Sequence, residues 1–471
     1  MNWFLFGTFV TVAAAMVAPA IWRKDYRLQF PSLAGLTVMY QIALPLASLN
    51  TQPDEISAAS LRRFSVMAIL CLLAAWTGYE WRWRSKHPSL MRFDSRRLVA
   101  SAIILVALGG FFTWRYSRVV PEFDPEKGGM TGIATVYLTL AFVGRYGAIL
   151  AAILLMRVKD WLLLVLILPQ LWAYYQLFLI GRRGPTGEVL VVVCMLLFFY
   201  RQWAIPLWLM LLGVFGMAVF CFNIGTIRAT VEQPLSERIE AIRAGDPLDS
   251  LTLQGMARDR QFVEVFNAAK FMEAKAQGGH YTHGLHFWNQ LVFGYVPAQI
   301  VGREFKESLK IPLTDDAELT GFEKPAGTCE TGIGEAFMAY GYFGCGLFFV
   351  LGAFMRWAWE GVMRKNILHQ FVIMLCTLQA VLTFSTQLWT FVNLLASIAL
   401  FAGPFLWWSR VPSGAPVARE EPEGHQERRL KWRKGWSRRS AGPKPAVAKQ
   451  VEGLDGSQPP MKGAGNVVHD R

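Results

Sequence analysis

Residues Trp203–Phe222 read WAIPLWLMLLGVFGMAVFCF and carry no charged side chain. An α-helix rises about 1.5 Å per residue, so about 20 apolar residues cross a hydrocarbon core about 30 Å thick. Directly after this stretch, from Asn223 to Gly332, the chain becomes far more polar. An apolar segment of membrane length followed by a long polar segment predicts a helix that crosses a bilayer and then enters an aqueous loop.

Segments of this kind recur on both sides of the loop, and they predict the fold class. Hydrophobic residues make up 53% of the chain and charged residues only 17%, whereas soluble domains carry about 25% charged residues. The strands of a β-barrel would alternate at period two, which these segments do not. The sequence therefore predicts an all-α, polytopic integral membrane protein with about eleven transmembrane helices. The predicted spans are Asn2–Trp22, Phe30–Asn50, Phe64–Tyr79, Leu98–Trp114, Gly132–Met156, Trp161–Ile180, Glu188–Tyr200, Trp203–Phe222, Gly334–Trp359, Ile367–Thr386 and Leu388–Trp408.

Four regions follow from this pattern. Residues 1–222 hold the first eight predicted helices, residues 223–333 the large loop, residues 334–408 the last three helices and residues 409–471 a basic tail. Within the loop, apolar residues at helical spacing predict an amphipathic helix that lies along the membrane surface or over the mouth of the bundle. The tail is rich in Pro, Gly and charge and cannot bury enough apolar surface to offset its ordering entropy, so we predict that it is disordered.

The placement of Lys and Arg predicts the orientation in the membrane. Basic residues gather on one set of alternate loops and on the tail, which the positive-inside rule places in the cytoplasm. The N-terminus and the large loop then face the periplasm, and the C-terminus is cytoplasmic. The net charge of +13 is explained by this topology and predicts no nucleic-acid partner. The basic loop residues that carry the assignment are Arg23, Lys24, Arg27, Arg82, Arg84, Lys86, Arg92, Arg96, Arg97, Arg157, Lys159, Arg201, Arg356, Arg364 and Lys365.

Two arginines, Arg182 and Arg183, follow the sixth predicted span in a glycine-rich turn that reads GRRGPTG. They lie on the side where the topology leaves few positive charges. Because a guanidinium holds phosphate oxygens in bidentate geometry, the pair predicts a pyrophosphate site. The alternative is a pair of side chains that reach the lipid headgroups.

Three further arginines are candidates for contacts with an anionic substrate. Arg145 lies near the middle of the fifth predicted span, where a guanidinium is costly unless it is paired or faces a polar cavity. It is therefore either a structural ion-pair partner or part of a cavity wall. Arg258 and Arg260 open the amphipathic loop helix and lie on different faces of it, so one would reach a substrate while the other is solvated.

His280, His283 and His286 recur at a spacing of three residues, which invites comparison with a zinc site. The glycines around them argue against a regular helix, and no Cys or carboxylate completes a site, so we predict no metal. A single histidine acting as a base or binding a sugar is the favoured interpretation. Glu335 lies in the first turn of the ninth span, where the helix dipole favours a carboxylate. It either helps to start that helix or accepts a proton from a sugar hydroxyl.

Together these features resemble the bacterial oligosaccharide repeat-unit polymerases, the Wzy-type O-antigen polymerase family. The resemblance covers most of residues 130–400 and depends on the late large loop, the turn Gly181–Gly184, and the stretches Gly284–Pro297 and Gly334–Gly344. Members of this family usually carry an Ile-Pro-Arg-like turn after the loop aromatics. This chain has Tyr-Val-Pro-Ala at residues 295–298, and Arg303 is the candidate substitute for the missing arginine.

The resemblance implies a metal-independent glycosyltransferase of the bacterial inner membrane that needs no cofactor. Its substrate would be an oligosaccharide on undecaprenyl pyrophosphate, polymerised into O-antigen, capsule or exopolysaccharide, and a chain-length regulator or a flippase would be a partner. A sugar hydroxyl would attack the anomeric carbon and displace the lipid pyrophosphate. On this basis Arg182, Arg183, Arg145 and Arg258 are candidates for the pyrophosphate, Arg260, His280, His283 and Arg303 for the glycan, and Glu335 or His286 for the base.

Two alternatives stay open. A ligase-like transferase would share the fold and the loop but hand the glycan to a different acceptor. A flippase or other transporter would spread polar residues through many spans, whereas acidic residues are scarce in the spans of this chain.

Overall fold

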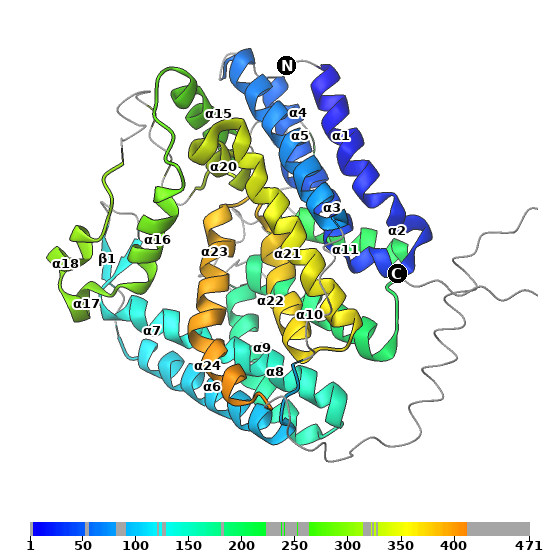
Figure 1. The fold of residues 1–471 in the computed structure, drawn as a ribbon, viewed down its shortest axis with the longest axis vertical. Helices are drawn as coiled ribbons and strands as arrows, with labels where there is room; N and C mark the ends of the chain where they lie inside the picture. Colours follow the sequence, from blue (N-terminus) through cyan, green and yellow to red (C-terminus); the bar gives the residue numbers. More distant parts are fainter. Residues whose placement is uncertain are drawn as a thin grey trace, which may run out of the picture. The chain divides into compact units, whose positions relative to one another are not determined.

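A computed structural model of the chain describes residues 3–51, 56–81, 91–119, 122–124, 129–179, 183–222, 263–313 and 328–411, together with a few isolated residues. The regular secondary structure of this part is helical apart from one short antiparallel ribbon, β1 (Glu122–Asp124) with β2 (Gly129–Thr131) (Figure 1), and one isolated β-bridge between Phe93 and Arg410. Residues 1–412 form one compact unit. The tail after Val411 lies outside the described residues, so its disorder stays a prediction.

Eight helical segments among the described residues are long and apolar enough to cross a membrane. The prediction of a polytopic helical membrane protein is therefore confirmed. The ninth predicted span begins at Gly332, two residues earlier than expected, because Thr331 caps its first turn. The eight segments are Trp3–Trp22, Phe30–Asn50, Ala58–Glu80, Ser95–Tyr116, Ile133–Val158, Trp161–Phe178, Gly332–Met363 and Leu388–Trp408.

Several of these segments consist of more than one helix. They contain α1 (Trp3–Val17) and α2 (Pro19–Trp22); α3 (Phe30–Val38) and α4 (Leu44–Asn50); α5 (Ala58–Glu80); α6 (Ser95–Tyr116); α7 (Ile133–Ala141) and α8 (Val143–Val158); α9 (Leu164–Leu179); α20 (Gly332–Tyr340) and α21 (Cys345–Met363); and α23 (Leu388–Ser397) and α24 (Gly403–Trp408). The three remaining predicted spans also coincide with helices, namely α10 (Arg183–Arg201), α11 (Leu207–Phe222) and α22 (Ile367–Leu382).

Glycines allow the longest helices to pack closely. Helix α21 lies along α5 (Figure 1), and a Cβ atom at Gly352 would come within 2.0 Å of the Ala75 carbonyl oxygen. The contact is reciprocal, since a Cβ atom at Gly78 would come within 2.1 Å of the Phe349 carbonyl oxygen. Small residues that let two backbones approach are typical of helix pairs in membranes, where packing replaces the hydrophobic effect as the source of stability.

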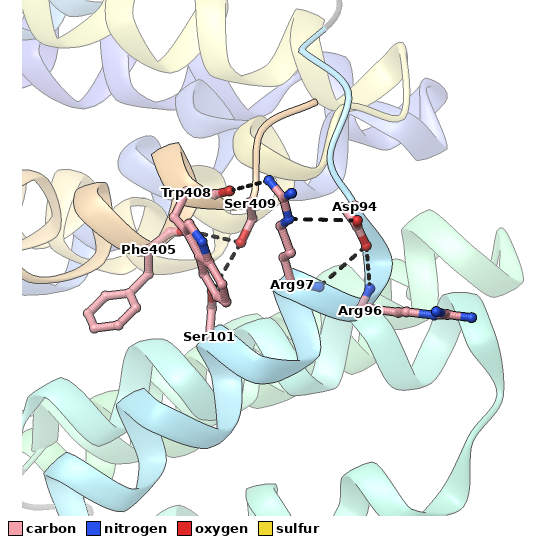
Figure 2. A network of polar contacts seen from close by, with 7 residues as sticks. All are labelled: Asp94, Arg96, Arg97, Ser101, Phe405, Trp408 and Ser409. Atoms are coloured by element: carbon pink, nitrogen blue, oxygen red, sulfur yellow. Dashed lines mark hydrogen bonds and ion pairs between the residues drawn. The ribbon is translucent and has the colours of Figure 1, made fainter. Parts of the chain in front are cut away.

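The basic loops that the sequence assigns to the cytoplasm contact one another. Arg27 donates to the Ile205 carbonyl at 2.7 Å, and Arg157 donates to the Tyr200 hydroxyl at 3.0 Å. Arg97 donates to the Trp408 carbonyl at 3.2 Å, within a network that joins the start of α6 to the end of α24 (Figure 2). These contacts agree with the prediction that alternate loops share one side of the helical bundle.

The described part of the large loop contains four helices: α15 (Val263–Ala276), α16 (Leu285–Tyr295), α17 (Ala298–Val301) and α18 (Arg303–Ser308). Helix α15 corresponds to the predicted amphipathic helix and packs against α5 and α20. Its buried apolar residues are Val265, Ala268, Ala269, Met272 and Ala274. Helix α16 packs against α23. The loop helices α15 and α16 are therefore fixed to the ends of the membrane-length helices.

Candidate functional site

Glu335 is held at the meeting point of two helix N-termini. It lies in the first turn of α20, whose N-cap Thr331 accepts a hydrogen bond from the backbone N–H of Gly334 at 3.1 Å. One of its carboxylate oxygens, Oε2, accepts a hydrogen bond at 3.0 Å from the backbone N–H of Trp389, in the first turn of α23. The first N–H groups of a helix have no partner within the helix and carry a partial positive charge. The arrangement therefore stabilises a negative charge on a carboxylate that is only 2% exposed.

His286 reaches this carboxylate from the large loop. It is the second residue of α16, and its Nε2 atom lies 3.3 Å from Glu335 Oε1. Its other ring nitrogen, Nδ1, lies 2.7 Å from the Thr282 hydroxyl. The sequence offered Glu335 and His286 as alternative bases, and the structure brings them together as one pair.

The turn that carries His286 is fastened to the C-terminal end of α20. The backbone N–H groups of Thr282 and His283 donate to the carbonyls of Met338 and Ala339, both at 3.0 Å. The Tyr340 hydroxyl donates to the His283 carbonyl at 3.0 Å. His283 and Gly284 adopt positive φ angles of 48° and 80°, which lets the chain turn into α16 at this point. Loop and membrane-length helix are thus joined on either side of the pair.

A carboxylate beside an imidazole is a usual arrangement for a general base. The carboxylate orients the ring and fixes which nitrogen carries the proton, which leaves the other nitrogen as an acceptor. In the tautomer that places the proton on Nε2, which faces the Glu335 carboxylate, the lone pair is on Nδ1. The pair can therefore accept one proton from a hydroxyl group and stabilise the resulting imidazolium.

Arg145 belongs to a second polar cluster, inside the helical bundle. Its guanidinium lies 3.8 Å from the Glu188 carboxylate and donates to the Tyr146 hydroxyl at 3.1 Å. The Tyr146 hydroxyl in turn lies 2.6 Å from the Ser397 hydroxyl. Of the two sequence-based interpretations, the ion pair is therefore realised. Arg145 Nε, Glu188 Oε1 and the Tyr174 hydroxyl are buried without a hydrogen bond of good geometry, although the Tyr174 hydroxyl lies beside Glu188 and Gln170.

Helices α16 and α23 connect the two clusters. Trp389 contacts Glu335 and Ser397 contacts Tyr146, and eight residues of α23 correspond to about 12 Å. Burial raises the pKa of the Tyr295 hydroxyl above its usual range, so the hydroxyl stays protonated and donates to the Asn393 carbonyl at 2.7 Å. The two clusters therefore contact opposite ends of α23.

The other predicted site residues whose side chains the structure describes do not join the pair. His280 and His283 are exposed, and the His283 ring packs against Tyr340. Arg303 is exposed at the start of α18. Arg182, Arg258, Arg260 and the side chain of Arg183 lie outside the described residues. Where side chains are described, no group of three or more His, Cys, Asp or Glu residues is arranged to hold a metal ion.

Sequence reasoning missed Thr282, Trp389 and Glu188. Glu188 carried a usable signal, because it is an acidic residue at the start of an apolar segment. Trp389 acts through its backbone N–H, and Thr282 acts through a turn that spacing does not reveal, so neither carried such a signal. No family model, curated protein or solved structure matches the chain.

Proposed function

We propose that the chain is a membrane glycosyltransferase that polymerises oligosaccharide repeat units carried on a lipid diphosphate. The observation that carries this proposal is the His286–Glu335 pair, with Glu335 buried and His286 half-buried, held between the large loop and the ends of α20 and α23. Transfer of a glycan from a lipid diphosphate to a sugar hydroxyl needs a base for the hydroxyl and cations for the leaving group. The pair supplies the base, and the sequence supplies an unusual number of arginines on the same side.

The proposal includes the finer topology. Helices α10, α11 and α22 cross the membrane together with the eight longer segments, which gives eleven spans. The N-terminus and the large loop face the periplasm and the C-terminus the cytoplasm of a bacterial inner membrane, because the basic loops gather on the opposite side from the large loop. The contacts of Arg27, Arg97 and Arg157 between these basic loops support this arrangement.

In the proposed reaction the acceptor hydroxyl loses its proton to the His286–Glu335 pair and attacks the anomeric carbon of the growing glycan. The bond between that carbon and the diphosphate oxygen breaks, and its electron pair leaves with the lipid diphosphate. We assign Arg182 and Arg183 to the developing negative charge, with Arg258 as a further candidate. Arg145, whose cluster contacts the other end of α23 through Tyr146 and Ser397, serves a deeper part of the lipid-linked substrate.

The experiment that tests this function is a deletion strain whose surface polysaccharide and lipid-linked intermediates are separated on gels. A polymerase predicts that only single repeat units reach the surface. Polymer that accumulates on the lipid carrier without reaching its final acceptor would indicate the ligase-like alternative. Repeat units trapped on the cytoplasmic side would indicate a flippase and would overturn the proposal.

A further inference from the structure

We propose that the Thr282 hydroxyl is the group through which the acceptor sugar delivers its proton to His286. The inference rests on the proposed function and assigns a catalytic role to a residue that sequence reasoning did not select. Thr282, His286, Glu335 and the Trp389 N–H form one continuous chain of polar contacts, with separations of 2.7, 3.3 and 3.0 Å. The Thr282 end of this chain is the end that meets the substrate.

The first step of the argument concerns Nε2 of His286. This atom is buried and has no hydrogen-bond partner of good geometry, while the Glu335 carboxylate lies 3.3 Å away. An atom in that position cannot receive a proton directly from a sugar. It holds a proton of its own toward the carboxylate, as an imidazole beside a charged carboxylate does.

The second step concerns Nδ1, which is the acceptor that remains. The Thr282 hydroxyl covers it at 2.7 Å, whereas the same hydroxyl lies 3.5 Å from the Met338 carbonyl. In the tautomer with the proton on Nε2, Nδ1 is an acceptor and the hydroxyl donates to it at this shorter contact. A substrate proton therefore reaches the imidazole by way of the threonine oxygen.

The third step concerns the rigidity and position of Thr282. Its backbone N–H donates to the Met338 carbonyl at 3.0 Å, and its own carbonyl accepts from the Leu285 N–H at 2.9 Å. Thr282 is half-buried, while its neighbours Tyr281 and His283 are exposed. The backbone thus fixes the hydroxyl against His286, between two exposed residues.

The proton transfer balances as a relay. The acceptor O–H bond breaks as its proton passes to the Thr282 oxygen, and the Thr282 proton passes to Nδ1 of His286. The acceptor oxygen forms a bond to the anomeric carbon, and the bond to the diphosphate breaks with its electron pair on the leaving group. The imidazolium, paired with Glu335, returns its proton through Thr282 to water after the lipid diphosphate has left.

The test uses the purified full-length chain in lipid nanodiscs with lipid-linked repeat units as substrate. Thr282→Val keeps the branched shape and removes the hydroxyl, whereas Thr282→Ser keeps the hydroxyl. General acid–base catalysis contributes about 100-fold or more to a rate, so T282V should lose about 100-fold in kcat with little change in KM, and T282S should retain most activity. The solvent deuterium isotope effect of the wild type and T282S should exceed that of residual T282V turnover, because two protons move in the relay.

Thr328→Val is the matched control. Thr328 lies in the same loop and its hydroxyl donates to the Pro325 carbonyl at 2.7 Å and accepts from Asn267 at 2.9 Å, so T328V removes structural hydrogen bonds and should lower the melting temperature without changing the isotope effect. If T282V unfolds, Thr282→Ala carries the same test.

The relay is overturned if T282V turns over at the wild-type rate while His286→Ala is inactive, because His286 then takes the proton directly and the proposed function stands. If His286→Ala is as active as the wild type, the proposed function itself fails at this site.

Discussion

Two polar regions of this molecule differ in how completely their hydrogen-bonding groups are satisfied. Where α6 begins and α24 ends, Asp94 accepts from the Arg96 N–H at 2.8 Å, Arg97 donates to the Trp408 carbonyl at 3.2 Å, and Ser101 lies 3.0 Å from Ser409 (Figure 2). We call this set the α6–α24 network. Its charged side chains are about half exposed, at 48% for Arg97 and 39% for Asp94.

The second region consists of the His286–Glu335 pair and the Arg145–Glu188 pair. Here the ion pairs are 3.3 and 3.8 Å long, which is no longer than the 3.8 Å between Arg97 and Asp94, but the acidic side chains are only 3% and 12% exposed. His286 Nε2, Arg145 Nε and Glu188 Oε1 are buried without a hydrogen-bond partner. A buried polar group without a partner costs about 1–3 kcal/mol. The first region therefore adds to stability by joining helices, whereas the second keeps polar groups that cost stability, which is what the proposed function requires of a site.

The largest expected effect comes from His286→Ala. Removing the base should lower glycan polymerisation by about 1000-fold, within the range that general acid–base catalysis contributes. A deletion strain complemented with this variant should show single repeat units on gels while the protein level in the membrane stays normal. Long polymer at the wild-type level would show that His286 takes no part in the reaction. The proposed catalytic role of the second region would then be wrong.

Variants of Arg145 and Glu188 test whether the stability of the second region depends on the pairing of these two buried charges. Arg145→Met leaves the Glu188 carboxylate buried and unpaired, which should cost about 3–5 kcal/mol of unfolding free energy. The double variant Arg145→Met/Glu188→Met should recover most of that loss. Denaturant unfolding in detergent measures both. A single variant as stable as the wild type would mean that the pair faces water rather than the interior.

The turn that contains Arg182 and Arg183 tests the part of the proposal that concerns the diphosphate leaving group. Loss of one preorganised donor to a developing anion costs about 3 kcal/mol of barrier, so Arg183→Ala should abolish visible surface polymer and leave single repeat units on the lipid carrier. The membrane level of the protein should stay normal in an immunoblot. Unchanged long polymer would show that the turn is not the diphosphate site.

The smallest effect is expected in the α6–α24 network. Exposed ion pairs contribute about 1 kcal/mol or less, so Arg97→Ala should lower the melting temperature slightly and leave polymerisation unchanged. A loss of polymerisation comparable to that of His286→Ala would show that the exposed region also serves the reaction, and the contrast between the two regions would not hold.

Much of the fold was predictable because a bilayer imposes strict length and polarity limits. Each predicted span coincides with a helix, since about 20 apolar residues without charge have few other stable arrangements. The breaks within the spans were less predictable. The interruption between α20 and α21 occurs at Gly341, whose φ of 59° fits a glycine packed against Tyr281, and that contact joins the loop to the membrane-length helix.

The candidate site was predictable residue by residue but not as an arrangement. His286 and Glu335 were each selected for their own chemistry, and only the fold shows that α16 returns to the first turn of α20. Arg145 was expected to need a partner because of its depth in the span, yet its partner Glu188 comes from a different helix. Thr282 could not be selected, because a threonine in a polar loop is ordinary until its contact with Nδ1 of His286 is known.

The central claim is that the His286–Glu335 pair takes a proton during glycan transfer, and Glu335→Gln in the purified, reconstituted chain tests it most directly. The glutamine keeps the shape of the side chain and an oxygen that can accept from the Trp389 N–H, but it cannot stabilise an imidazolium. We predict that the wild type joins two lipid-linked repeat units while E335Q, equally stable, does so about 100-fold more slowly. Equal rates for the two proteins would contradict the account.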